Sequence, residues 1–116
     1  MTETTLNLPQ RIAAAASDKK ARDIVILNLT GISTVADEFI ICSAASSTQV
    51  KAIADHIEDK LVEQGYAPLR KEGGREGRWI LLDYGDTVAH VFVEEERAFY
   101  NLERLWGDAP SENYDA

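Results

Sequence analysis

Residues 78–92 read RWILLDYGDTVAHVF, and this stretch predicts a β-hairpin. Two apolar, β-branched runs at 78–83 and 87–93 flank the turn Asp83-Tyr84-Gly85-Asp86. Gly85 suits the positive φ of a tight turn, and Asp83 is expected to anchor that turn by accepting hydrogen bonds from nearby backbone N–H groups. Aromatic, carboxylate and imidazole groups therefore gather on one rigid hairpin, which is where a small protein would build a contact site.

The sequence on either side of the hairpin predicts further strands and helices. Apolar runs bounded by turn residues predict strands at 23–29, 38–43, 68–71, 78–83 and 87–93. Helical spacing of apolar residues predicts helices at 8–20, 46–64 and 94–106. Asn7 and Ser46 are expected to cap the first two helices, and Gly65 to close the second. The order helix, two strands, helix, three strands, helix predicts an α/β (α+β) fold, a sheet of about five strands flanked by helices.

Domain organisation follows from the length of 116 residues, which suits one domain. Residues 1–7 and 108–116 are expected to be loosely held tails. In the last predicted helix, four apolar side chains are expected to face the core: Phe99, Leu102, Leu105 and Trp106.

Charge is the sharpest constraint from composition. Twelve basic and twenty acidic residues give a formal net charge of −8. Such a surface repels phosphate backbones and attracts basic partners, although many soluble proteins are acidic without any such partner. The single cysteine, Cys42, rules out an internal disulfide and fits a reducing cytosol, so a cytoplasmic location is expected. No apolar run approaches the roughly 20 residues of a bilayer span, and the N-terminus has no secretion-signal pattern.

Candidate chemical motifs have simpler explanations. The glycine-rich loop 73–77 lies between two predicted strands, so it is expected to be a hairpin connection and not a phosphate-binding loop. Asp83 and Asp86 lack an obvious third ligand, and no metal or cofactor site is expected. Asp86 is expected either to anchor the turn or to contact a partner. His90 is expected in the core or at its boundary, and Trp79 is either a partner anchor or covered by a helix or the tail.

Five segments, taken together, resemble the Iojap-like family, whose bacterial members are ribosomal silencing factors. The resemblance spans roughly residues 8–110 and rests on ADEFIICS (36–43), SSTQVKAIAD (46–55), WILLDYGD (79–86), HVF (90–92) and FYNLERLW (99–106). Departures from the family pattern are minor: Glu38 replaces a usual aromatic, Asn101 a usual aspartate, and Ala44-Ala45 a small pair that contains glycine.

The resemblance implies a binding protein and not an enzyme. Family members associate with the large ribosomal subunit through its fourteenth protein, on the face that meets the small subunit. They thereby block subunit joining and lower translation in starvation or stationary phase, while organellar relatives assist large-subunit assembly. A mixed sheet similar to the nucleotidyltransferase fold, and a homodimer, are also implied. The residues that match the family's motifs are Trp79, Asp83, Tyr84, Asp86, His90, Tyr100 and Arg104.

Two other functions stay open. A nucleotidyl-transfer enzyme would need a Gly-Ser pair opening a helix and an Asp-x-Asp on the next strand. This chain has no Gly-Ser dipeptide and no Asp-x-Asp on a predicted strand, and a fold alone does not carry function. The second alternative is a dimeric adaptor for another basic partner.

Overall fold

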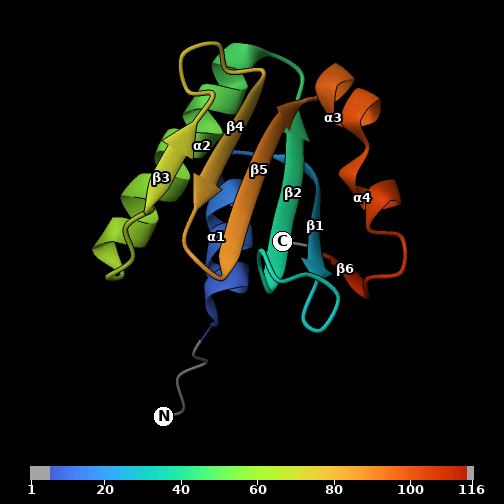
Figure 1. Cartoon of the computed structure of the whole chain (residues 1–116). Helices are drawn as coiled ribbons and strands as arrows, with labels where there is room; N and C mark the ends of the chain where they lie inside the picture. The colour runs from blue at the N-terminus through green and yellow to red at the C-terminus, as the bar shows by residue number, and fades with distance from the viewer. Residues whose placement is uncertain (1–5, 115–116) are drawn as a thin grey trace.

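The computed structural model describes residues 6–114. Within these residues the chain forms one mixed sheet with helices on both faces (Figure 1). The elements in chain order are α1 (Leu8–Asp18), β1 (Arg22–Asn28), β2 (Glu38–Ala44), α2 (Ser47–Glu63), β3 (Arg70–Glu72), β4 (Trp79–Asp83), β5 (Thr87–Val93), α3 (Glu94–Tyr100), α4 (Leu102–Leu105) and β6 (Ser111–Asn113).

The sheet has six strands in the order β3-β4-β5-β2-β1-β6. Strands β2 and β5 are parallel, with Ile41 opposite His90, and every other neighbouring pair is antiparallel. Parallel neighbours need a long crossover connection, and here α2 and the β3–β4 hairpin lie between them in the chain. The predicted α/β class and mixed sheet are confirmed, while the likeness to the nucleotidyltransferase fold stays a prediction.

One face of the sheet is covered by α1 and α2, which lie behind it in Figure 1. Asn7 caps α1 in a capping box, and the Ser46 hydroxyl accepts from the Gln49 N–H at the start of α2. Gly65, at φ 94°, follows the end of α2 as predicted. The two helices and the sheet share a core of aliphatic side chains, which includes Ile12, Val50, Ile53, Ile57, Leu61, Ile40, Ile80, Leu82 and Val91.

The predicted helix 94–106 is wrong as a single element. It breaks at Asn101, whose φ of 47° is left-handed and whose side chain accepts from the Arg104 N–H to cap α4. The break turns Leu102 and Trp106 onto the sheet, against a second apolar cluster around Leu27 and Phe92. Phe99 and Leu105, which were expected to face the core, are instead 79% and 70% exposed.

The C-terminal segment also differs from the expected loose tail. Residues 111–113 form β6, which pairs with β1 through Val25 opposite Asn113 and Leu27 opposite Ser111. The Tyr114 N–H also donates to the Ile24 carbonyl at 2.9 Å. The sheet therefore has six strands and not about five. The expectation for residues 1–5 and 115–116 lies outside the described residues, whereas Asn7 is held as the cap of α1.

None of the helices in residues 6–114 is long and apolar enough to cross a bilayer.

Removing the chain after Pro110 tests the role of β6. The truncation deletes the backbone pairing with β1, and at about 1 kcal/mol net per hydrogen bond it should lower the free energy of unfolding by about 2–4 kcal/mol. Urea denaturation of the full chain and the truncated chain measures the difference, with a chain ending at Tyr114 as control. Equal stability of all three would contradict the assignment of β6 as part of the fold.

Candidate partner-binding face

The face of the sheet opposite α1 and α2 is only partly covered. Figure 1 shows α3 and α4 along the β1 side, so that no helix crosses β3, β4 and β5 in this view. Strand alternation places Ile80 and Leu82 in the helix-covered core and their neighbours on the other side. We call this other side the open face, and it carries Arg70, Glu72, Trp79, Leu81, Asp83, Val88 and His90.

Aromatic rings in contact lead from the open face to the surface of α3. Trp79 stacks on Phe92 at 4.8 Å between ring centroids and meets Tyr100 at 4.7 Å. Tyr100 in turn meets Phe99 at 5.1 Å. At the other end, Phe39 contacts His90 at 4.5 Å and Trp106 at 6.3 Å. We call this set the aromatic strip: Phe39, Trp79, His90, Phe92, Phe99, Tyr100 and Trp106.

The aromatic strip is buried at its centre and exposed at its α3 end. Phe92 is 1% exposed, whereas Tyr100 and Phe99 are 46% and 79% exposed. Trp79 is half-buried because Tyr100 lies against it. Of the two alternatives for Trp79, the structure therefore supports cover by a helix, while one part of the ring stays accessible to a partner.

His90 is a core residue, as predicted, with 4% of its surface exposed. The Trp79 Nε1–H donates to His90 Nδ1 at 3.0 Å. Since Nδ1 accepts, the neutral imidazole carries its proton on Nε2, and in the described part of the chain that atom is buried without a hydrogen-bond partner. Burial lowers the pKa of His90 to about 4, so the ring is neutral at physiological pH.

The hairpin turn is built around Asp83, which confirms its predicted role. Its Oδ1 accepts from the Gly85 N–H at 2.8 Å, and its Oδ2 lies 3.6 Å from the Arg70 guanidinium. Gly85 has a φ of 97°, a value that costs glycine little. Asp86 is exposed, and its carbonyl accepts from the Asp37 N–H at 2.7 Å. This bond ties the turn to the start of β2.

Tyr84 lies on the opposite side of the sheet from Trp79, Asp83 and His90. Its ring packs against the core under α1 and α2, and its hydroxyl is buried with no hydrogen-bond partner among residues 6–114. Burial, with a smaller contribution from Glu58, raises the pKa of Tyr84 to about 12. The structure thus brings Trp79, His90 and Tyr100 together, whereas Asp83 lies at the other end of β4 and Tyr84 lies on the opposite side of the sheet. Its predicted part in binding stays a prediction.

The corner between α3 and α4 carries the remaining predicted residue. Arg104 is exposed and lines a shallow depression with Phe99, Tyr100 and Leu105. Arg97 holds this corner to the sheet: its guanidinium donates to both oxygens of Glu103, at 3.0 and 3.2 Å, and to Ser43 Oγ at 3.1 Å.

Sequence reasoning missed three contributors to this surface. Arg97 reads as a solvated helix residue because its partners lie outside its own element. The sequence places Phe39 and Leu81 on predicted strands but does not assign either side chain to one face of the sheet. Strand alternation from Trp79 would have found Leu81, since both point to one side of β4.

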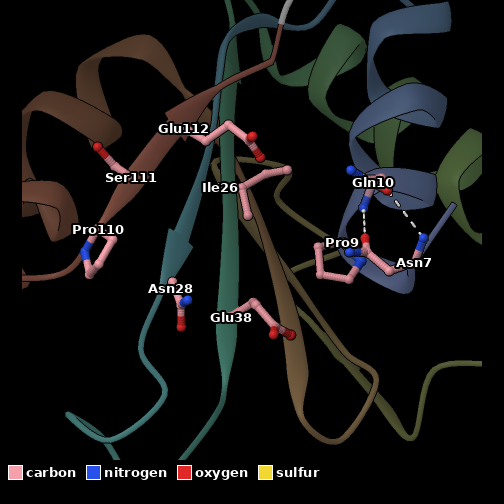
Figure 2. Close-up of a pocket in the computed structure, with 9 residues that line it drawn as sticks. All are labelled: Asn7, Pro9, Gln10, Ile26, Asn28, Glu38, Pro110, Ser111 and Glu112. Atoms are coloured by element: carbon pink, nitrogen blue, oxygen red, sulfur yellow. Dashed lines mark hydrogen bonds between the residues drawn. The ribbon is translucent and has the colours of Figure 1, made fainter.

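A separate groove lies between the start of α1 and the strands β1, β2 and β6 (Figure 2). Its volume is about 280 Å³, and its lining includes the carboxylates of Glu38 and Glu112. Glu38 is engaged already, because its Oε1 accepts from Thr87 Oγ1 at 2.8 Å. Across residues 6–114 there is no group of three His, Cys, Asp or Glu side chains placed to hold a metal. Burial also raises the pKa of the Cys42 thiol to about 12, which leaves it unreactive.

Comparison with known proteins assigns the family. The family described as "Ribosomal silencing factor during starvation" matches residues 2–116. The chain belongs to this family. Its relatives include the ribosomal silencing factor of Bacillus subtilis, 52% identical over 89% of this chain and 87% of the relative. The chloroplastic protein Iojap of Zea mays is 36% identical over 90% of this chain and 45% of the relative.

A solved structure of similar sequence has the same fold. A crystal structure from Bacillus halodurans superposes with a TM-score of 0.81 at 46% identity, covering 92% of this chain and 97% of that one. The resemblance to Iojap-like ribosomal silencing factors, seen in the five sequence segments, is thereby confirmed. The family is regulatory, and its description names no catalytic activity.

The buried neutral His90 predicts a specific dependence of stability on pH. Its pKa is about 4 in the folded protein and near the ordinary 6.5 in the unfolded chain. The stabilisation that neutral His90 gives the folded protein is therefore complete above pH 6.5. It is lost as the pH falls toward 4, and the free energy of unfolding drops by about 3 kcal/mol in total. Urea unfolding at several pH values should show this loss in the wild type but not in His90→Leu, in which the carboxylates still titrate. Parallel curves for the two proteins would contradict the burial of a neutral imidazole.

Tyr84→Phe removes a buried hydroxyl that has no partner in the described residues. We expect the free energy of unfolding to rise by up to about 1 kcal/mol, because an unsatisfied polar group no longer has to be desolvated. Thermal and urea unfolding measure the change, with Tyr100→Phe as the control at a more exposed ring. A loss of more than about 1 kcal/mol in Tyr84→Phe would mean that the hydroxyl is hydrogen-bonded.

Proposed function

We propose that this protein binds the large ribosomal subunit through the subunit's fourteenth protein and sterically blocks joining of the small subunit. Translation is repressed as a result, under starvation or in stationary phase. The single observation that carries the proposal is the match of residues 2–116 to the family of ribosomal silencing factors. The ribosome is named in the relative from Bacillus subtilis as well, which supports the same role here.

We propose the open face and the exposed end of the aromatic strip as the binding surface. Interface centres are commonly built from half-buried Trp and Tyr side chains surrounded by a polar rim. Trp79 and Tyr100 meet that description, and both are held by ring contacts before any partner arrives. Farther along the open face, Glu72 and Asp83 both pair with Arg70, so the polar rim there is an ion-paired cluster and not a set of free carboxylates.

The charge balance supports a protein partner over bare RNA. With a net charge of −8, the chain is repelled by phosphate backbones and attracted by a basic ribosomal protein. No sequence-specific contact with nucleic acid, no membrane contact and no cofactor belong to the proposal.

We further propose that the protein is not an enzyme. A nucleotidyl-transfer reaction would need carboxylates that hold metal and triphosphate, and the alternating Glu94 and Glu96 instead lie in the first turn of α3. Arg22 pairs with Glu94, and Arg78 pairs with Glu96 at 2.6 Å. These ion pairs leave the two carboxylates occupied, which supports a binding role.

A homodimer in the cytoplasm completes the proposal. The family resemblance implies the dimer, and no residue of the open face or the aromatic strip is assigned to its interface. A dimeric adaptor for another basic partner is the alternative function that the same surface would serve.

Sucrose-gradient co-sedimentation with purified ribosomal subunits tests the proposed function. The protein should migrate with free large subunits, and joined ribosomes should decrease as protein is added. Migration with small subunits only, or with neither subunit at micromolar protein and moderate salt, would overturn the proposal and favour the adaptor.

Tyr100→Ala tests the proposed surface. The variant removes a 46% exposed ring from the aromatic strip, and we expect its dissociation constant for large subunits to rise about 10- to 30-fold. The matched control is Val62→Ala, which truncates a 58% exposed side chain on α2, behind the sheet. Equal binding by both variants, with folding intact, would exclude the strip as the contact.

A further inference from the structure

We propose that His90 is a positioning residue for partner binding: its Nδ1 holds the Trp79 indole in the orientation that the open face presents to a basic protein of the large subunit. This inference rests on the proposed function. It goes beyond it by assigning a role to a buried side chain that a partner would not touch.

The geometry around Trp79 shows why the hydrogen bond matters. The indole stacks on Phe92, with ring planes 28° apart, and Tyr100 packs against it at 4.7 Å. Stacking holds the indole against Phe92 but still allows small rotations about its side-chain torsions. The bond from Nε1 to His90 Nδ1, at 3.0 Å, removes this freedom because it is directional.

If His90 served only to fill space, an apolar side chain would cost less free energy to bury. At 4% exposure it leaves the Nε2–H buried and without a partner among residues 6–114, a defect that leucine or phenylalanine would avoid. The surrounding side chains on β2, β4 and β5 are apolar, with Ile41 and Leu81 directly opposite His90 on its two neighbours. What the imidazole provides and an apolar side chain does not is an acceptor for Trp79.

The orientation of Trp79 affects the exposed surface because Tyr100 packs against the indole. Tyr100 contacts both Trp79 and Phe99, so the exposed end of the aromatic strip is supported by the indole beneath it. A Trp79 ring that is free to turn would leave Tyr100 without a fixed support. Pre-organised anchors bind more tightly because less freedom is lost on association.

Two variants of similar shape separate positioning from packing. His90→Asn keeps an acceptor near the place of Nδ1, whereas His90→Leu is nearly isosteric with asparagine but has no acceptor. The first readout is hydrogen exchange of the Trp79 indole N–H by NMR, with the signal assigned by comparison with Trp106→Phe. The second is affinity for purified large subunits by co-sedimentation, with urea unfolding to record the stability of each variant.

We expect the indole N–H to exchange at least 10-fold faster in His90→Leu than in the wild type, and within 3-fold of the wild type in His90→Asn. Affinity should follow the same order, with a loss of about 10-fold in His90→Leu that His90→Asn largely restores. Equal losses in both variants, or exchange that accelerates with no loss of affinity, would overturn the positioning role. If the wild type itself does not bind large subunits, both the proposed function and this role of His90 are overturned. If the wild type binds, the comparison of the two variants tests the role of His90 alone.

Discussion

The structure depends on the burial of both sides of β5. All seven residues of this strand, Thr87–Val93, are buried, and it pairs with β2 on one edge and β4 on the other. Ala89, Val91 and Val93 face the helices α1 and α2, while alternate residues face the opposite cluster. A strand buried on both faces requires cover from two layers. The α3–α4 corner supplies only part of the second layer: β5 itself is buried, and the accessible part of the open face lies on β3 and β4.

That incomplete layer explains why the candidate site lies where it does. A buried polar group without a partner costs free energy, and on the partly covered sheet Asp83 is bonded to its own turn and Trp79 is bonded to His90. The side chains are held by the fold before any partner binds. Such a surface suits recognition of a folded protein, because little order has to be created on association.

Local signals were sufficient for much of this architecture. Asn7, Ser46 and Gly65 mark helix ends through their own chemistry, and the hairpin turn follows from Asp83 and Gly85. The break at Asn101 was not predictable from spacing, because a helical pattern continues through it. Strand β6 has no β-branched or aromatic residue, and it exists only because β1 offers an unpaired edge. The separation of Tyr84 from the open face is likewise a matter of which side the chain turns to after Asp83.

Footprinting of the protein on the ribosome tests the central claim that the open face and the aromatic strip make the contact. Hydroxyl-radical oxidation followed by mass spectrometry would compare side-chain reactivity in the free protein and in the complex with large subunits. The account predicts protection at Phe99, Tyr100 and Leu81, with Val62 on α2 as reactive as in the free protein. Protection of Val62 and the outer surface of α2, with Phe99 and Tyr100 unchanged, would contradict it.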